Sequence, residues 1–250
     1  MEIAELYQKG LELDAEAERL EESGRKDPAV NCQTAYQKAA VLRKEAACYW
    51  KQAAEQGHVD AQYRLALYFH YGKKNNQAFY WCKMAAEQGL PMAQYTLGSY
   101  YCGVGVVADT RKSLFWREKA FENGVLAAGE ILAQYYRDQR NYKKAIEWNM
   151  KIIDFPDVLI SAKATAEYNM GEMQQNHFKD IEKALYWYKR SAGNGNGLAA
   201  YRLAEYYEAQ GDIEQAVQWY RKSAKVYFSD AKLWLEKHEL GSVHISRIVI

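Results

Sequence analysis

Apolar and small residues recur at intervals of three and four positions along most of the chain, the spacing that places them on one face of an α-helix. One such pattern returns five times between residues 61 and 207. The pattern begins with a small residue. A large apolar residue follows four positions later, directly before a second small residue, and most copies end in an aromatic residue. The copies begin at Ala61, Ala93, Ala128, Ala166 and Ala199, and their large residues are Leu65, Leu97, Leu132, Met170 and Leu203. The small residues allow close approach of neighbouring helices, so the pattern predicts packed helices.

A second pattern alternates with the first and ends in glycine. The sequence Ala53-Ala-Glu-Gln-Gly57 returns as Ala85-Ala-Glu-Gln-Gly89, and tryptophan marks the same frame at positions 81, 116, 148, 187 and 219. These intervals are typical of a two-helix repeat. Each unit is predicted to be an A helix, a loop and a B helix closed by a left-handed glycine. We predict that the tryptophans lie in the core. Inter-repeat packing is predicted for Tyr68, Tyr100, Tyr135 and Tyr206, with Met173 in the same column.

The two ends of the chain depart from the repeat. Heptad-like spacing of Leu6, Gly10 and Leu13, and again from Ala35 to Ala53, predicts a helical hairpin with a loop at 23–31. We therefore divide the chain into an N-terminal cap running into the first B helix (1–57), a repeat array (58–228), and a C-terminal capping helix with a tail (229–250). The β-prone residues 242–250 match no repeat; a frayed terminus, docking on the cap and addition to a partner's sheet all stay open.

With these residues in place, the chain resembles the Sel1-like repeat (SLR) family, a branch of the tetratricopeptide-like (TPR-like) α-solenoids. The best match combines Leu97-Gly98, Gly103-Val-Gly-Val106, Asp109 and Trp116, and the resemblance covers roughly residues 46 to 240. It implies an all-α, right-handed α-solenoid of two-helix repeats with helical caps at both ends. It also implies an adaptor role, with the partner in the groove of the superhelix. The unit around Tyr135–Tyr142 lacks the Gly-x-Gly-Val loop and is more similar to a tetratricopeptide repeat.

Two columns of residues precede the large apolar residue of each A helix. Among them, the candidate partner-binding residues are Tyr63, Arg64, Tyr95, Thr96, Glu130, Tyr168, Asn169, Tyr201 and Arg202. In TPR-like repeats the equivalent positions face the concave groove, and tyrosine and arginine are favoured at interface hot spots. Arg64 and Arg202 suit a carboxylate or a backbone carbonyl of an extended peptide. The alternative is that the tyrosines half-fill repeat junctions while the arginines are solvated.

Charge and composition exclude several classes of function. The formal net charge is +1, with 26% charged residues, whereas nucleic-acid binding usually requires a strongly basic surface. No apolar run suffices for a membrane span, and the acidic N-terminus does not resemble a signal peptide, so we expect a cytoplasmic protein. Cys32, Cys48, Cys82 and Cys102 form no metal-ligand spacing, and reduced, buried thiols are expected.

Catalytic motifs are weak. Ser23-Gly-Arg-Lys26 matches the Ser-x-x-Lys of penicillin-recognising enzymes, but the companion Ser-Asp-Asn and Lys-Thr-Gly motifs are missing. The glycine-rich segments 103–106 and 193–197 lie between predicted helices, where a phosphate loop is not expected. The five histidines are scattered, so we expect no metal site and no cofactor.

The sequence thus favours a non-catalytic protein-protein interaction module that binds a protein or an extended peptide. An adaptor, a scaffold and an effector-sequestering, immunity-type protein all fit this class. The alternatives from other classes are a β-lactam-type hydrolase using Ser23 and Lys26, and a helical-repeat RNA binder. We expect neither nucleic acid nor membrane among the partners, and the oligomeric state stays open.

Overall fold

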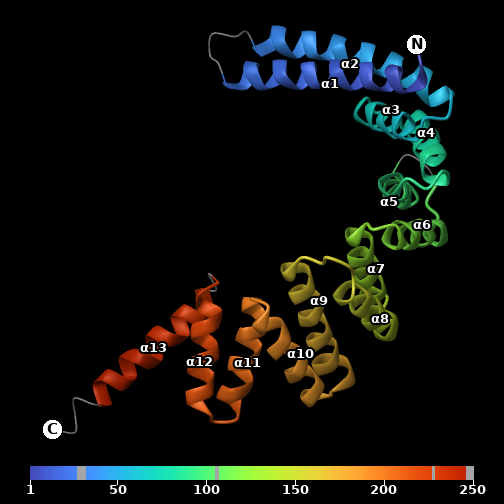
Figure 1. The fold of residues 1–250 in the computed structure, drawn as a ribbon. Helices are drawn as coiled ribbons and strands as arrows, with labels where there is room; N and C mark the ends of the chain where they lie inside the picture. The colour runs from blue at the N-terminus through green and yellow to red at the C-terminus, as the bar shows by residue number, and fades with distance from the viewer. Residues whose placement is uncertain (27–31, 105–106, 227–228, 246–250) are drawn as a thin grey trace. The chain divides into compact units, whose positions relative to one another are not determined.

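The computed structural model describes residues 1–26, 32–104, 107–226 and 229–245, with side chains up to residue 237. The described residues form helices and turns, without a strand (Figure 1). The helices are α1 (Ile3–Lys26), α2 (Cys32–Glu55), α3 (Val59–Tyr71), α4 (Asn75–Glu87), α5 (Pro91–Tyr100), α6 (Thr110–Glu122), α7 (Leu126–Asp138), α8 (Tyr142–Ile153), α9 (Ile160–Met173), the π-helix η1 (Gln174–Phe178), α10 (Ile181–Gly193), α11 (Gly197–Ala209), α12 (Ile213–Ala224) and α13 (Ser229–Ile245). The prediction of an all-α fold of two-helix repeats is confirmed.

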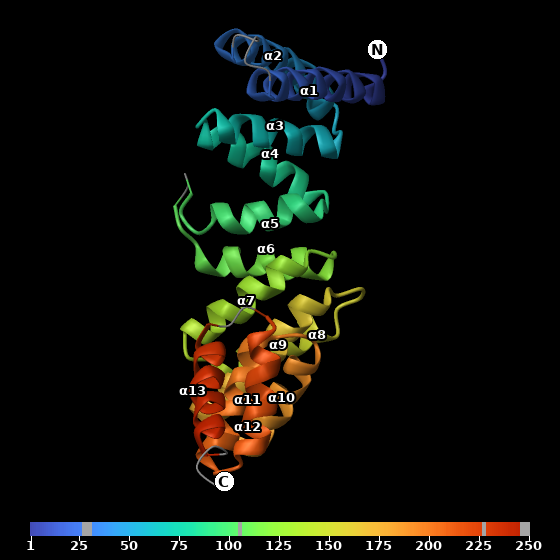
Figure 2. The same cartoon turned by 90° about the vertical axis from the view of Figure 1, so that its left-hand side faces the viewer.

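The helices group into two compact units, Met1–Ala128 and Gly129–Ile250. In the first unit the α1–α2 hairpin is followed by the pairs α3–α4 and α5–α6, whose members lie side by side (Figure 2). In the second unit α8 packs on α9, α9 on α10, α11 on α12, and α12 on α13. The predicted division at residues 57 and 228 concerns the repeats and stays a prediction.

The helix boundaries follow from local capping chemistry. Asp109, Asn141, Asp180, Asn196 and Asp212 each accept a hydrogen bond from the backbone N–H three residues later, at the start of α6, α8, α10, α11 and α12. Such side chains satisfy N–H groups that have no partner within the helix. Past four B helices, Gly57, Gly89, Gly124 and Gly195 have φ between 91° and 99°. The predicted glycine closure is therefore confirmed, and Asp157 takes a positive φ where α8 has no terminal glycine.

The predicted column of large apolar residues forms the core. Leu65, Leu97, Leu132, Met170 and Leu203 are all at most 3% exposed. In the N-terminal hairpin, Trp50 packs directly on Gly10, where a β-carbon would lie 2.3 Å from the indole Nε1. The predicted hairpin is thus present, and its close approach requires glycine at position 10.

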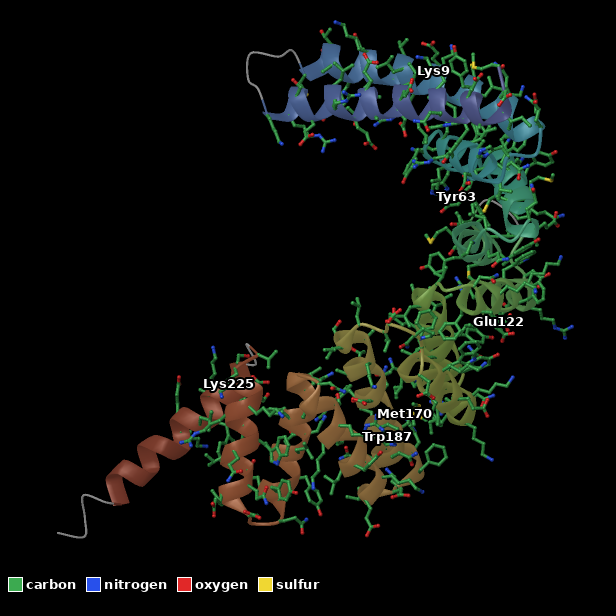
Figure 3. All side chains as sticks on the ribbon, in the orientation of Figure 1. Lys9, Tyr63, Glu122, Met170, Trp187 and Lys225 are labelled. Atoms are coloured by element: carbon green, nitrogen blue, oxygen red, sulfur yellow. The ribbon has the colours of Figure 1, made fainter. Side chains whose placement is uncertain are left out.

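The prediction for the tryptophan column is confirmed only in part, since Trp81, Trp116 and Trp219 pack against core residues without being fully buried. Trp148 is buried, but Trp81, Trp116, Trp187 and Trp219 are only partly buried, and the residue after each tryptophan takes the buried position. Consecutive residues lie about 100° apart around a helix, so the 3.6-residue period alone does not decide whether the tryptophan or the residue after it faces the core. Two of the partly buried tryptophans have a cation over the ring from three residues later: Arg190 lies over Trp187 and Lys222 over Trp219. Figure 3 labels Trp187 among the side chains of its unit.

Three segments differ from the sequence prediction. Helix α1 continues to Lys26, so Ser23 is helical and the connection to α2 is shorter than predicted. The π-helix η1 extends α9, which accounts for part of the long interval between Trp148 and Trp187. Helix α13 continues to Ile245, because extending an existing helix costs little even through β-branched residues. The predicted tail is helical up to that point, and residues 246–250 lie outside the described part.

Candidate partner-binding face

The A-helix columns of the first unit bring Tyr63 and Thr96 together. The Tyr63 hydroxyl lies 3.1 Å from Thr96 Oγ1, across α3 and α5. Thr96 donates its own proton to the Met92 carbonyl at 2.8 Å, so Tyr63 is the donor in this pair. Burial raises the pKa of Tyr63. Both side chains, and Tyr95 beside them, are half-buried, so these residues hold adjacent repeats together while presenting an edge to solvent. Figure 3 labels Tyr63 on α3.

Arg64 faces an acidic side chain of the N-terminal hairpin. Its guanidinium lies 3.9 Å from Asp14, which also receives a hydrogen bond from Arg43 at 3.4 Å. Arg43 forms a bidentate pair with Glu21 as well. A cavity of about 640 Å³ borders these groups, and its aromatic lining is Trp50, Tyr68, Phe69 and Tyr71. Both arginines of this cavity are therefore paired with carboxylates of the chain, and its lysine, Lys74, lies over the Phe69 ring.

In the second unit, Tyr168 and Arg202 meet at Glu172. Tyr168 donates its hydroxyl proton to Glu172 at 2.8 Å, and the Arg202 guanidinium lies 4.0 Å from the same carboxylate. Arg202 also donates to Glu205 at 2.9 Å. Burial, with the hydrogen bond to Glu172, raises the pKa of Tyr168 to about 12. Tyr201 packs edge-on against Tyr220, with ring centroids 5.5 Å apart, so this ring occupies a repeat junction.

A polar cavity of about 340 Å³ collects the remaining predicted residues, Glu130 and Asn169. It lies among α7, α8 and α9, and Arg137, Asn149, Ile152 and Thr165 also line it. The Asn169 side-chain oxygen accepts a hydrogen bond from Arg137 Nη1 at 3.0 Å. A second guanidinium nitrogen donates to the Gln134 side-chain oxygen. We call this site the Arg137 pocket.

Arg137 differs from the predicted arginines in its electrostatic surroundings. Among the described residues, no carboxylate lies within ion-pairing distance of its guanidinium; two amide oxygens hold it instead. Asn149, which is buried, donates to the Ala145 carbonyl at 2.7 Å, and its side-chain oxygen lies 3.5 Å from Asn169 Nδ2. The sequence analysis missed Arg137 because the residue stands five positions after the core Leu132, outside the two columns considered. Its presence in the atypical Tyr135–Tyr142 unit was the available signal.

The residues considered for catalysis are not assembled into a site. Ser23 and Lys26 are both exposed on α1, and Lys26 pairs with Glu22 at 2.5 Å. Within the described ranges, no group of three or more His, Cys, Asp or Glu side chains is placed to hold a metal ion. Searching the same residues also finds no helix long and apolar enough to cross a membrane.

The prediction of buried thiols is wrong for three of the four cysteines. Cys82 is buried, donates to the Ala93 carbonyl at 3.3 Å, and has a pKa raised to about 12 by burial. Cys32, Cys48 and Cys102 are exposed. Cys32 begins α2 and Cys102 lies beyond the end of α5, so neither sits on the buried face of a helix.

Comparison with known proteins agrees with this architecture. The sequence profile of the Sel1 repeat matches residues 43–58, 59–90, 91–125, 131–148, 164–196 and 197–225. A comparison with curated proteins found no match. Among solved structures, a Sel1 repeat protein from Oxalobacter formigenes is 26% identical, with 78% of this chain and 82% of that chain covered and a TM-score of 0.54.

Two further structures share the repeat. The protective antigen c5321 of uropathogenic Escherichia coli, which displays an SLR fold, is 25% identical over 94% of this chain and 58% of that chain, with a TM-score of 0.43. A putative Sel1 repeat protein from Klebsiella pneumoniae is 22% identical over 76% of this chain and 98% of that chain, with a TM-score of 0.40. Because the repeat profile covers well over half of its residues, the chain belongs to the Sel1 repeat family.

Proposed function

We propose that this protein binds an extended, acidic segment of a partner protein, and that the Arg137 pocket anchors this segment. Repeats of the Sel1 family generally serve as protein-interaction modules and are typically non-catalytic. The observation that carries the proposal is a half-buried guanidinium held in place by amide oxygens and without a carboxylate partner among the described residues. Its positive charge is available to an incoming anion.

The geometry of the pocket suits a carboxylate. A guanidinium has five N–H donors, and the contacts with Gln134 and Asn169 use only part of them. Those contacts also restrict the rotamers of Arg137, which lowers the entropy lost when a ligand binds. Arginine pairs with carboxylates through two parallel hydrogen bonds, and such charge-assisted bonds are stronger than neutral ones.

The other side of the pocket suits a peptide backbone. Glu130 is exposed and supplies an acceptor, whereas Asn169 supplies an amide that both donates and accepts. An extended peptide presents alternating N–H and C=O groups along one edge. We therefore place the acidic side chain of the ligand toward Arg137 and a backbone N–H toward Glu130, which also keeps the two carboxylates apart.

The cavity of the first unit is less suited to an acidic ligand. Its arginines, Arg43 and Arg64, already face Asp14 and Glu21. An added carboxylate would compete with those acids and be repelled by them. This contrast is the reason that the proposal assigns the acidic ligand to the Arg137 pocket rather than to the larger cavity.

An unbiased selection tests the proposal. A displayed library of random peptides is selected on the full-length protein and, in parallel, on Arg137→Gln, with Arg111→Gln as the matched control because Arg111 is an exposed helical arginine of the other unit. We expect wild type and Arg111→Gln to enrich peptides with a conserved Asp or Glu, and Arg137→Gln to lose that enrichment. Enrichment of the same peptides by all three proteins would contradict the proposal.

A further inference from the structure

A cluster of three side chains at the α5–α6 junction has no role in the proposed binding site. Cys102 follows α5, and its sulfur accepts hydrogen bonds at 3.3 Å from both Nη1 and Nη2 of Arg117 on α6. Ser113 Oγ lies 3.3 Å from the same sulfur and 2.5 Å from Arg117 Nη1. Ser113 donates its proton to the Gly98 carbonyl at 2.8 Å. Cys102 is an exposed residue, whereas Arg117 is only 9% exposed.

Arg117 is a buried cation that needs a counter-charge. Its Nε has no hydrogen-bond partner and is shielded from solvent, and no ion pair joins Arg117 to a carboxylate of the described residues. Burying a charge without an opposite charge is costly, so native structures pair such groups. The group that faces both terminal nitrogens of the guanidinium is the Cys102 sulfur.

The packing fixes Arg117 in this position. A β-carbon at Gly98 would lie 2.9 Å from Arg117 Cγ and 3.2 Å from the Ser113 carbonyl oxygen. Position 98 must therefore be glycine for the arginine stem to pass against α5. The stem is buried against that glycine, and the guanidinium emerges at the end of α5, where Cys102 is exposed.

Arg117 directly follows a repeat tryptophan, and the other repeats show which residues usually occupy that position. The residues that follow the repeat tryptophans are Cys82, Arg117, Asn149, Tyr188 and Tyr220, so Arg117 is the only charged member. Tyr188 donates to Gln175 at 2.8 Å, and Tyr220 donates to Glu208 at 2.7 Å. Gln175 and Glu208 stand five residues after their core Met170 and Leu203, as Cys102 does after Leu97. Cys102 thus occupies an acceptor position, opposite a donor that here carries a full positive charge.

We propose that Arg117 holds Cys102 as a nucleophilic thiolate, and that Cys102 is an oxidative modification site whose reagents are hydroperoxides. The thiolate attacks the terminal peroxide oxygen; the S–O bond forms, the O–O bond breaks, and the leaving alkoxide or hydroxide takes up a proton from solvent. Sulfur is oxidised by two electrons to the sulfenic acid, which keeps the hydrogen of the transferred oxygen, and the hydroperoxide is reduced to an alcohol or water. The inference does not depend on the proposed peptide ligand.

The electrostatics of the junction agree with this assignment. Burial raises the pKa of the Cys102 thiol, whereas the hydrogen bonds and the charge of Arg117 lower it, and the pKa lies below its ordinary value. The other charged groups at the start of α6 are Asp109, Arg111 and Lys112; Asp109 and Lys112 pair with each other at 3.3 Å, and Arg111 is exposed. Lys112 also lies over the Tyr101 ring, with 5.5 Å from its Nζ to the centroid.

The test uses the four thiols of the intact protein as one another's controls. Alkylation by iodoacetamide is followed by mass spectrometry from pH 5.5 to 9.5 for wild type and Arg117→Gln. Cys48 is exposed and reports reagent activity, and Cys82 is buried and reports unfolding. A lower pKa raises the thiolate fraction of a thiol at acidic pH, and the accompanying loss of nucleophilicity offsets only part of that gain. We therefore expect Cys102 of Arg117→Gln to react more slowly than Cys102 of wild type at pH 6.5, with Cys48 unchanged.

Hydroperoxide chemistry is tested on the same protein. A limiting amount of hydrogen peroxide with a sulfenic-acid trap should label Cys102 in wild type, and Arg117→Gln should lose most of that label. Equal labelling of Cys48 and Cys102, or unchanged Cys102 reactivity in Arg117→Gln, overturns the proposal. If Arg117→Gln exposes Cys82 by unfolding, the wild-type pH profiles decide: a Cys102 rate that levels off at lower pH than that of Cys48 supports the thiolate, and coincident profiles overturn it.

Discussion

At the scale of single residues, buried polar side chains connect three A helices, α3, α5 and α9, to the ends of their own B helices. Gln88 donates to Gln62 at 2.7 Å, Asn123 donates to Gln94 at 2.8 Å, and Asn194 donates to Glu167 at 2.7 Å. The acceptors are at most 3% exposed, and the donors are the residues at the C-terminal ends of α4, α6 and α10. These bonds hold the helix termini in place, because an unpaired buried polar group is costly.

Glu167 should be the most sensitive of these positions. It is fully buried, accepts from Asn194, and lies 3.0 Å from the Arg190 guanidinium. Replacing Glu167 by Ala removes the acceptor of Asn194 and the ion pair of Arg190, and is expected to lower the free energy of unfolding by about 1–3 kcal/mol, with a smaller loss for Glu167→Gln, which keeps an acceptor. Urea denaturation measures both. Equal stability of Glu167→Ala and wild type would show that water replaces these contacts.

Because of Tyr100, we predict that the protein becomes less stable at alkaline pH. Burial raises its pKa to about 12, above the value near 10 of an unfolded tyrosine, and its hydroxyl bonds His70 Nδ1 at 3.1 Å. Between these pH values the unfolded state loses the proton and the folded state keeps it. The contribution of Tyr100 to the free energy of unfolding is therefore complete below pH 10. It is lost as the pH rises toward 12, by less than about 1.4 kcal/mol per pH unit.

Denaturant unfolding at pH 9 to 11.5 checks this dependence. The free energy of unfolding of Tyr100→Phe should fall less steeply with pH than that of wild type. Parallel curves for the two proteins would mean that Tyr100 ionises equally in both states.

At the scale of helices, the sequence predicted the core and the glycine closures because both are local patterns. The end of α1, the π-helix and the extent of α13 were missed, since a helical period does not specify where a helix stops. The candidate site was predicted only in part. Glu130 and Asn169 do line one pocket, but Arg137 reaches it from about two turns further along α7, and only the packing of three helices places it there.

Gly171 allows a close contact between α9 and α10. A β-carbon there would lie 2.5 Å from the Tyr188 ring, which is buried and anchored by its bond to Gln175. Gly171→Ala is expected to destabilise the protein by about 1–3 kcal/mol through overpacking. Gly193→Ala is the matched control, because it is also helical and its β-carbon meets nothing within 4 Å. Thermal unfolding should separate the two, and an equal midpoint would contradict the account of this contact.

At the scale of the whole molecule, the helices form two units, within which α1 to α6 and α8 to α13 each pack on their neighbours in sequence. Stability in such arrays is a sum of local terms. At the end of the second unit, Trp234 of α13 stacks on Tyr220 with ring centroids 4.2 Å apart and donates to Glu208 at 2.8 Å. Helix α13 therefore covers the last repeat pair, as the predicted C-terminal cap requires.

Trp234→Ala should act locally. We expect a loss of about 2–3 kcal/mol in the second unit, since the indole is partly buried. Hydrogen exchange should show lower protection of α11 and α12 and unchanged protection of α1 to α4. The exposed Leu233→Ala is the control. A uniform loss of protection along the chain would show that the units unfold together.

The central claim is that Arg137 receives a carboxylate of a partner segment, and its most direct test is the affinity of one selected acidic peptide. Fluorescence anisotropy compares wild type, Arg137→Gln and Arg111→Gln, with circular dichroism to confirm the fold. A lost charged hydrogen bond costs about 1.5–3 kcal/mol, so we predict a Kd at least about tenfold higher for Arg137→Gln and unchanged for Arg111→Gln. Equal affinity of Arg137→Gln and wild type for the peptide would contradict the account.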